Sequence, residues 1–101
     1  MKRLENKKYR DGAKDEQCKM NVAGVCNYDP DTVVLAHVKC LGGSWGAKTH
    51  DFSGVDACSA CHEWLDSYKG EEEDRLFYTR RGIIRTLENR FERGLIKWGN
   101  K

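Results

Sequence analysis

The sequence predicts a small α+β domain whose hydrophobic core is too thin to be its only source of stability. Residues 32–38 are apolar and β-branched, which is typical of a strand, and residues 72–93 have the apolar period of a helix. Only 39% of the 101 residues are hydrophobic and 34% are charged, against about 45–50% and about 25% in an average domain. Such a chain needs disulfides, a metal ion or a partner chain for stability.

The other elements follow from local signals. Residues 1–17 are polar without a clear apolar period, which favours an irregular or short helical lead-in. Residues 18–26 suit a turn or hairpin, and residues 41–49, with three glycines, indicate a loop. A second short strand or extended segment is expected over 51–56, and a helix over 59–68.

The helix expected over 72–93 should bury one apolar stripe. Acidic residues open this segment and arginines close it, as the helix dipole favours, and Gly94 is placed to end it. The apolar side chains expected in the buried stripe are Leu76, Phe77, Ile83, Ile84, Leu87 and Phe91.

Charge is segregated along the chain. Residues 51–74 hold eight acidic residues and one lysine, a formal charge of −7, whereas residues 75–101 hold eight basic and two acidic residues, a charge of +6. The basic C-terminal segment is either a solvated face or a surface that binds phosphates without reading sequence. Its candidate ligands are Arg75, Arg80, Arg81, Arg85, Arg90, Arg93 and Lys97, with Lys48 in the preceding loop. Arg81 and Arg85, four residues apart, share one helix face.

The sequence carries no apolar run long enough for a secretory signal or a membrane span. We therefore expect a cytoplasmic protein without membrane contact. Thiols stay reduced in the cytoplasm, so paired cysteines there indicate metal ligands or redox centres.

Five cysteines are the most specific feature of the composition. Cys58 and Cys61 form a C-x-x-C pair at the start of a predicted helix. Cys18 and Cys26 form a second, looser pair. Two pairs on two turns can supply the four ligands of a structural Zn²⁺ site, which would stabilise a thin core. Cys40 could replace one member of the looser pair.

The C-x-x-C pair is followed directly by His62, which gives the C-x-x-C-H pattern of c-type haem attachment. That chemistry belongs to exported proteins, and no export signal is present. A thioredoxin-like redox pair would need a surrounding βαβ pattern, which is also missing. A metal site therefore explains the cysteines better than either alternative.

Two histidines suit chemistry at a reactive site. His37 ends the predicted strand, where a side chain is held rigidly and still reaches solvent. His62 and Asp66 are four residues apart on the predicted helix, so they share a face and could hold a divalent cation that keeps positions open for water and substrate. The alternative is a structural pair on a surface helix.

A strand histidine, a glycine-containing loop and a C-x-x-C-H sequence that opens a helix resemble, in this order, the ββα-metal or HNH (His-Me finger) nuclease superfamily over about residues 18–68. More narrowly, the sequence is similar to the small nucleases of lambdoid prophages, the YbcO-like family. The similar stretches are Cys18 to Cys26, Leu35-Ala36-His37-Val38, Gly46-Ala47-Lys48 with Asp51, and Cys58-Ser59-Ala60-Cys61-His62 with Asp66. The resemblance implies a zinc-stapled, treble-clef-like ββα-metal finger with an added C-terminal helix.

The resemblance also implies site roles. His37 would be the general base that deprotonates a water molecule, and His62 with Asp66 would hold Mg²⁺ or Mn²⁺. Many members carry a further metal ligand before the strand histidine, where this chain has Ala36, and the middle asparagine of the motif has no match. Asp51 is the best substitute for it, as the residue that orients His37 or as a third ligand. The other candidates for this role are His50 and Asp56.

Together these features predict a metal-dependent HNH endonuclease that hydrolyses phosphodiester bonds in DNA and contacts its phosphates. Residues 1–17 would be a basic lead-in, 18–68 the core, and 69–101 a basic helix and tail packed on that core as one domain. The rival interpretation is a non-catalytic zinc-binding module that binds nucleic acid or a protein partner. Such a module would need none of His37, His62 and Asp66.

Overall fold

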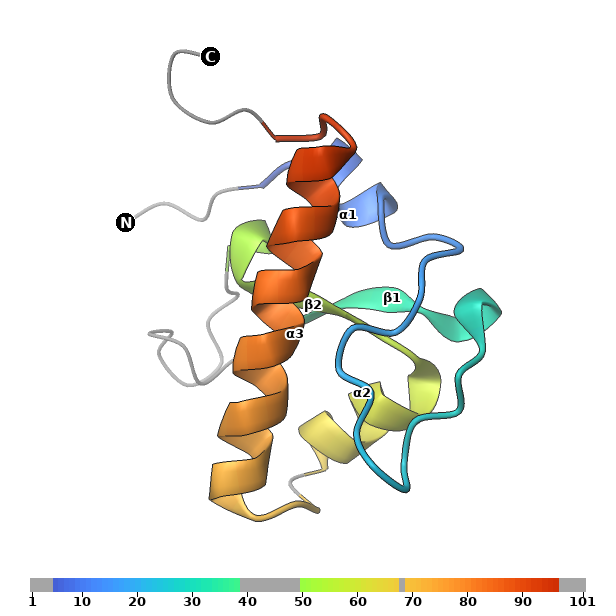
Figure 1. Cartoon of the computed structure of the whole chain (residues 1–101), viewed down its shortest axis with the longest axis vertical. Coiled ribbons are helices and arrows are strands. Elements are labelled where there is room, and N and C mark those ends of the chain that lie inside the picture. The colour runs from blue at the N-terminus through green and yellow to red at the C-terminus, as the bar shows by residue number, and fades with distance from the viewer. Residues whose placement is uncertain (1–4, 39–49, 68, 97–101) are drawn as a thin grey trace.

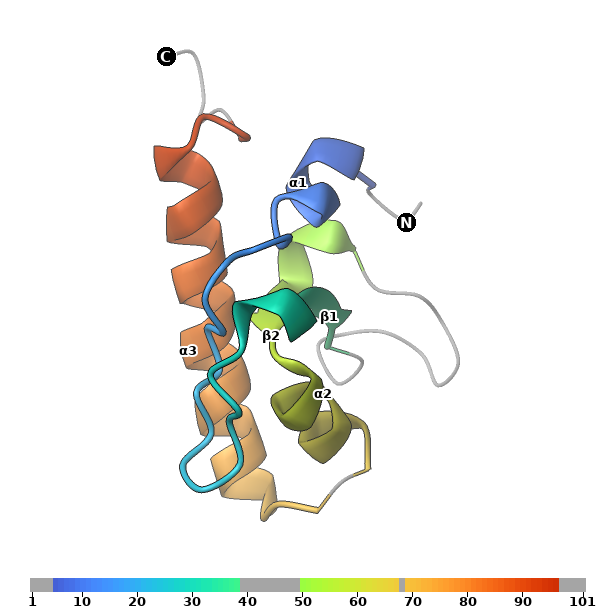
Figure 2. The same ribbon diagram turned by 90° about the vertical axis from the view of Figure 1, so that its right-hand side faces the viewer.

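The computed structural model describes residues 5–38, 50–67 and 69–96. The elements are α1 (Lys7–Asp11), β1 (Val34–His37), β2 (Gly54–Ala57), α2 (Ser59–Asp66) and α3 (Glu72–Glu92), with 3₁₀ turns at Pro30–Thr32 and Asp51–Ser53. The predicted α+β class is confirmed, with a single two-stranded sheet among the described residues. In Figures 1 and 2, α3 runs along one side of the strands, with α1 beside its C-terminal half and α2 beside its N-terminal half.

The predicted segments are shortened by turns and caps. A 3₁₀ turn that the Asp29 side chain caps occupies the start of the strand predicted over 32–38. Asp51–Ser53 is a second 3₁₀ turn that leads directly into β2. Gly94 follows α3 with a φ of 73°, a conformation that glycine adopts without strain, so its predicted role in ending the helix is confirmed. Within the described residues, none of the helices is both long and apolar enough to cross a bilayer.

The two strands are antiparallel, with Val34 opposite Ala57 and His37 opposite Gly54. This register brings the end of β1 next to the start of β2, and therefore next to the Asp51–Ser53 turn. Every residue of β2 is buried. The end of the sheet that carries His37 thus receives the side chains of that turn.

The buried face of α3 differs from the predicted one. The α3 residues that are buried are Thr79, Gly82, Thr86 and Arg90. By contrast, Phe77, Ile84 and Phe91 are 55%, 58% and 52% exposed. The predicted burial of these three apolar side chains is therefore wrong.

The reason lies in the strand that α3 crosses. A Cβ atom on Gly82 would collide with Cγ2 of Val55, so the helix approaches the strand closely only at a glycine. The backbone N–H of Asp56 donates to Oγ1 of Thr86 (3.0 Å), and that hydroxyl donates to the carbonyl of Gly82 (2.8 Å). The face of α3 that packs on β2 therefore carries small and hydrogen-bonding residues, because buried polar groups of the strand need partners.

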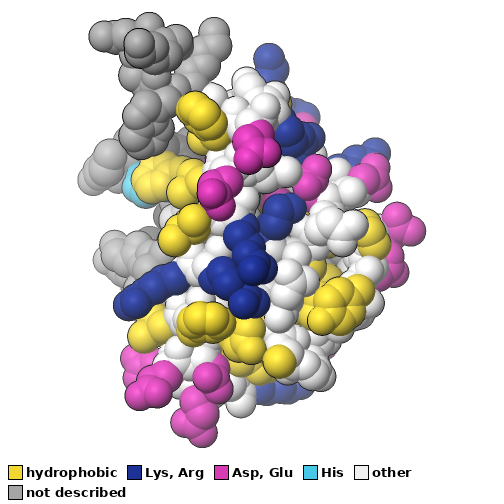
Figure 3. Space-filling model, viewed as in Figure 1, with side chains coloured by type: hydrophobic (Ala, Val, Ile, Leu, Met, Phe, Trp, Pro, Cys, Tyr) yellow, Lys and Arg dark blue, Asp and Glu magenta, His cyan; other side chains and the backbone are white. Residues whose placement is uncertain are grey.

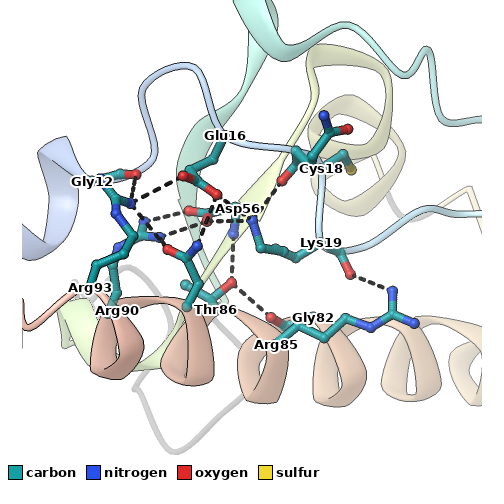
Figure 4. Close-up of polar contacts among 12 residues, drawn as sticks. Gly12, Glu16, Cys18, Lys19, Asp56, Gly82, Arg85, Thr86, Arg90 and Arg93 are labelled. Carbon is teal, nitrogen blue, oxygen red and sulfur yellow. Dashed lines mark hydrogen bonds and ion pairs between the residues drawn. The ribbon is translucent and has the colours of Figure 1, made fainter.

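A fully buried ion pair joins β2 to α3 (Figure 4). The guanidinium of Arg90 donates to both carboxylate oxygens of Asp56, at 2.6 and 2.8 Å. Nε of Arg90 donates to the carbonyl of Tyr9 (2.9 Å), whose buried phenol has its pKa raised to about 12 by burial. Two predictions are therefore wrong: Arg90 cannot bind phosphate, and Asp56 cannot serve the histidine site.

Candidate active site and metal centre

Four cysteine sulfurs gather where the segment between α1 and β1 meets the start of α2. They belong to Cys18, Cys26, Cys58 and Cys61, and all lie within 4.8 Å of one another. Four sulfurs about 2.3 Å from a tetrahedral Zn²⁺ would be about 3.8 Å apart. The Sγ atoms of Cys26 and Cys58 are 3.8 Å apart, so this cluster can hold a metal ion such as zinc. Cys40 lies outside the described residues.

Backbone N–H groups support both halves of the cluster. The N–H of Cys61 donates to Sγ of Cys58, and the N–H of Asn21 donates to Sγ of Cys18, each at 3.4 Å. Asn21 has a positive φ of 47° and also places its side-chain nitrogen 3.6 Å from Sγ of Cys26. Sequence reasoning missed Asn21, although Cys-x-x-Asn repeats the spacing of the C-x-x-C pair and was the signal that could have found it.

The same contacts set the charge of the cluster. A hydrogen bond from the Cys61 thiol, helped by the N–H of Asn21, outweighs burial and lowers the pKa of Cys18 to about 4. That hydrogen bond, together with burial, raises the pKa of the Cys61 thiol. Cys18 therefore favours the thiolate form, which binds cations. A metal ion that binds here would displace the protons of the other thiols.

His37 contacts the carboxylate of Asp51, the acid that the sequence singles out for it. Nε2 of His37 lies 2.8 Å from Oδ1 of Asp51. The other oxygen, Oδ2, accepts hydrogen bonds from the backbone N–H of Asn6 (2.6 Å) and from Nη1 of Arg10 (3.2 Å). The carboxylate is thus held from two sides, while the imidazole keeps 28% of its side-chain surface exposed.

Asp51 is ionised in this setting. Burial by itself raises the pKa of its carboxyl, but the hydrogen bonds from His37 and Asn6, with the charge of Arg10, outweigh burial and lower that pKa. The sequence did not indicate that Asn6 or Arg10 contacts Asp51, because each lies more than 40 residues from it in the chain and no local pattern predicts such a contact. The alternative residue His50 stacks on Phe52, with ring centroids 4.9 Å apart.

His62 and Asp66 form a second histidine–carboxylate pair, on α2. Nε2 of His62 lies 3.2 Å from Oδ2 of Asp66, and the two side chains are 36% and 54% exposed. Cys61 belongs to the cysteine cluster, so His62 directly follows one of its members on α2. Among the described residues, the four cysteines are the one group of three or more His, Cys, Asp or Glu side chains close enough to share an ion. His62 and Asp66 therefore offer a cation two protein ligands.

Arg81 and Arg85 reach the loop that carries Cys18. The guanidinium of Arg81 donates to the carbonyl of Met20 (2.9 Å), and that of Arg85 contacts the side-chain oxygen of Asn21 (3.2 Å). Both side chains are half-buried, and these contacts occupy part of their donor capacity. They tie α3 to the cysteine cluster, so any phosphate contact would use their remaining donors. Lys48 lies outside the described residues.

Comparison with known proteins assigns the chain to a family. Residues 7–95 match the family described as "Putative nuclease YbcO". Proteins with that description from Escherichia coli (strain K12) and from Enterobacteria phage 82 are each 41% identical over 58 residues, which are 56% of this chain. The chain spans 60% of the length of these curated relatives.

A solved structure shares the fold. The protein described as "a putative bacteriophage protein from Escherichia coli str. K-12 substr. MG1655" superposes with a TM-score of 0.72 at 29% identity. The superposition covers 86% of this chain and 100% of that one. Because the family match runs from α1 to the end of α3 and includes both histidine–carboxylate pairs and all four clustered cysteines, the chain belongs to the YbcO family.

Proposed function

We propose that the chain is a metal-dependent endonuclease of the HNH type that hydrolyses phosphodiester bonds in DNA, with His37 as its general base. The observation that carries the proposal is the 2.8 Å contact between Nε2 of His37 and a buried carboxylate of Asp51. The family description and the order of elements, β1, β2 and then α2 with the cysteine cluster at its start, support it.

The Asp51 contact sets the tautomer of His37. An ionised carboxylate can only accept, so Nε2 of the neutral imidazole carries the proton, and Nδ1 is left as the acceptor for a proton from water. When His37 takes that proton it becomes a cation, and Asp51 stabilises it. Arg10 and Asn6 keep the carboxylate in place and ionised.

His62 and Asp66 would hold the catalytic Mg²⁺ or Mn²⁺. Two neighbouring ligands about 2.1 Å from an octahedral ion lie about 3.0 Å apart, close to the 3.2 Å between these two atoms. Both side chains are exposed enough for a substrate phosphate to approach. A divalent ion there would act as a Lewis acid on the scissile phosphate and stabilise the leaving oxygen.

The cysteine cluster would act as a structural support for this site. Cys58 caps α2 and Cys61 lies on it, so a Zn²⁺ held by both, with Cys18 and Cys26, would fix the start of α2 against the segment between α1 and β1. α2 contacts β2, the strand that follows the Asp51–Ser53 turn. β2 also pairs with β1, which carries His37, so the elements of the two histidine–carboxylate pairs are linked through β2.

Substitution of His37 by alanine should lower the rate of DNA cleavage by about 10²–10⁴-fold, the contribution that general base catalysis typically makes. The measurement is plasmid nicking and linearisation by the zinc-loaded protein with Mg²⁺ or Mn²⁺, with and without EDTA. Glu63→Gln is the matched control on the exposed side of α2, since its side chain makes a long 3.6 Å surface ion pair with Lys69 and no other ion pair within the described residues. If wild type cuts no better than His37→Ala under every metal, the protein is a non-catalytic zinc module.

Substitution of Asp51 by asparagine tests its role as a positioning residue. We expect cleavage to slow by roughly 10–100-fold, part of the contribution of the base. The loss should fall on kcat with little change in KM, because Asp51 orients the imidazole of His37 and is itself buried. A raised KM with an unchanged kcat would contradict this role.

A further inference from the structure

The exposed side of α3 carries an apolar stripe that the described part of the chain does not cover. Phe77, Ile84 and Phe91 lie seven residues apart and are each more than half exposed. Seven residues are nearly two helical turns, so the three side chains line one side of the helix over about 21 Å. Figure 3 shows apolar side chains following α3 on this face, interrupted by basic ones.

A shallow apolar groove adjoins one end of the stripe. It has a volume of about 360 Å³ and is lined by Leu87, Glu88, Phe91 and Ile96. The opposite end of the stripe carries Phe77, an aromatic ring of the kind such a groove accepts. One surface thus holds both an apolar projection and an apolar recess.

We propose that a second copy of this chain covers this face, with the two α3 helices antiparallel and a two-fold axis through Ile84. In such a pair, residues equally distant from Ile84 face each other. Phe77 and Phe91 are each seven residues from it, so Phe77 of one copy meets Phe91 and the groove of the other. Ile84 meets its own counterpart on the axis, as the self-matching interface of a two-fold dimer requires.

The charges on the stripe obey the same relation. Arg80 and Glu88 are each four residues from Ile84 on opposite sides of it, and both are exposed. The two-fold axis therefore places Arg80 of each copy opposite Glu88 of the other, which gives two ion pairs. Neither side chain has a hydrogen bond or ion pair within the described residues. A parallel arrangement would instead set Arg80 against Arg80 and Glu88 against Glu88, which disfavours it.

The size of the surface sets the expected strength. α3 has 21 residues and is about 31 Å long, so one helix-on-helix contact falls at the low end of the range for specific interfaces. We therefore expect a reversible dimer that forms at concentrations on the order of 10–100 µM.

Sedimentation velocity of the zinc-loaded full chain from about 5 to about 500 µM should show a monomer–dimer equilibrium. Ile84→Glu should weaken the dimer by more than about tenfold, because it sets two like charges against each other on the axis. Val34→Glu is the matched control, since Val34 is 47% exposed on β1, away from the stripe. This variant should dimerise like wild type. Circular dichroism and zinc content check that each variant is folded.

A charge exchange tests the orientation. Arg80→Glu and Glu88→Arg should each weaken the dimer, and the double variant should restore it, because the two residues are eight positions apart and meet only between copies. A chain that stays monomeric at the highest concentration overturns the proposal. So does a dimer that Ile84→Glu leaves intact, and a double variant that fails to recover excludes the antiparallel pairing.

Discussion

Substitution of Cys58 by serine, or treatment of the zinc-loaded protein with a chelator, is expected to unfold the protein. Cys58 contributes one of the four clustered sulfurs and also caps the first turn of α2. Structural Zn²⁺ contributes on the order of 10 kcal/mol to folding, as much as the whole stability of an ordinary small domain. With 39% hydrophobic residues, this chain has little core to compensate for that loss.

The experiment compares zinc content per chain, by inductively coupled plasma mass spectrometry, with thermal unfolding followed by circular dichroism. Wild type should carry one equivalent and unfold cooperatively, whereas Cys58→Ser should lose most of its zinc and its cooperative transition. Cys40→Ser is the matched control, because the four sulfurs that cluster among the described residues already make a full tetrahedral set. Unchanged zinc in Cys58→Ser, or loss of zinc in Cys40→Ser, would refute the proposed ligand set.

Substitution of Asp56 by alanine is expected to destabilise the protein by about 3–5 kcal/mol, because it leaves the charge of Arg90 buried without its partner. Both side chains are fully buried, so water cannot replace the lost carboxylate. The backbone carbonyl of Tyr9 would remain as an acceptor for Nε of Arg90, but it carries no full negative charge.

Urea denaturation of the zinc-loaded protein measures this loss. Asp31→Ala, at an exposed position, is the matched control and should change the free energy of unfolding by less than about 0.5 kcal/mol. The double variant Asp56→Leu, Arg90→Met should recover much of the loss, since an apolar pair of similar volume often replaces a buried ion pair without cost. If the double variant is less stable than Asp56→Ala, the unpaired charge is not the cause.

The sequence predicted those parts of the fold that local patterns encode. The β-branched run, the helix starts and stops and the spacing of the cysteines all depend on neighbours within a few residues, and the structure confirms them. The contact between His37 and Asp51 followed from the resemblance, in which Asp51 was the best substitute for the missing asparagine, as the residue that orients His37 or as a third ligand.

Contacts between distant segments could not be predicted in this way. Apolar periodicity indicated the wrong face of α3, because the periodicity carries no information about the strand that the helix packs on. That strand places Val55 close to the helix and presents the polar backbone of Asp56. Asn6 and Arg10 reach the site only once α1 has docked beside it. The apolar side chains of α3 that remain exposed, Phe77, Ile84 and Phe91, are those that the proposed dimer would bury.

The Arg90 contacts have a consequence for local opening of the native state. Arg90 is held at the same time by β2 and by the carbonyl of Tyr9 on α1, so the last turns of α3 cannot lift away without releasing α1. Hydrogen exchange should therefore report α1 and the C-terminal half of α3 as one cooperative unit with similar protection, although more than 70 residues separate them. The amide of Asp56, which donates to Thr86 beneath the helix, should be among the slowest to exchange.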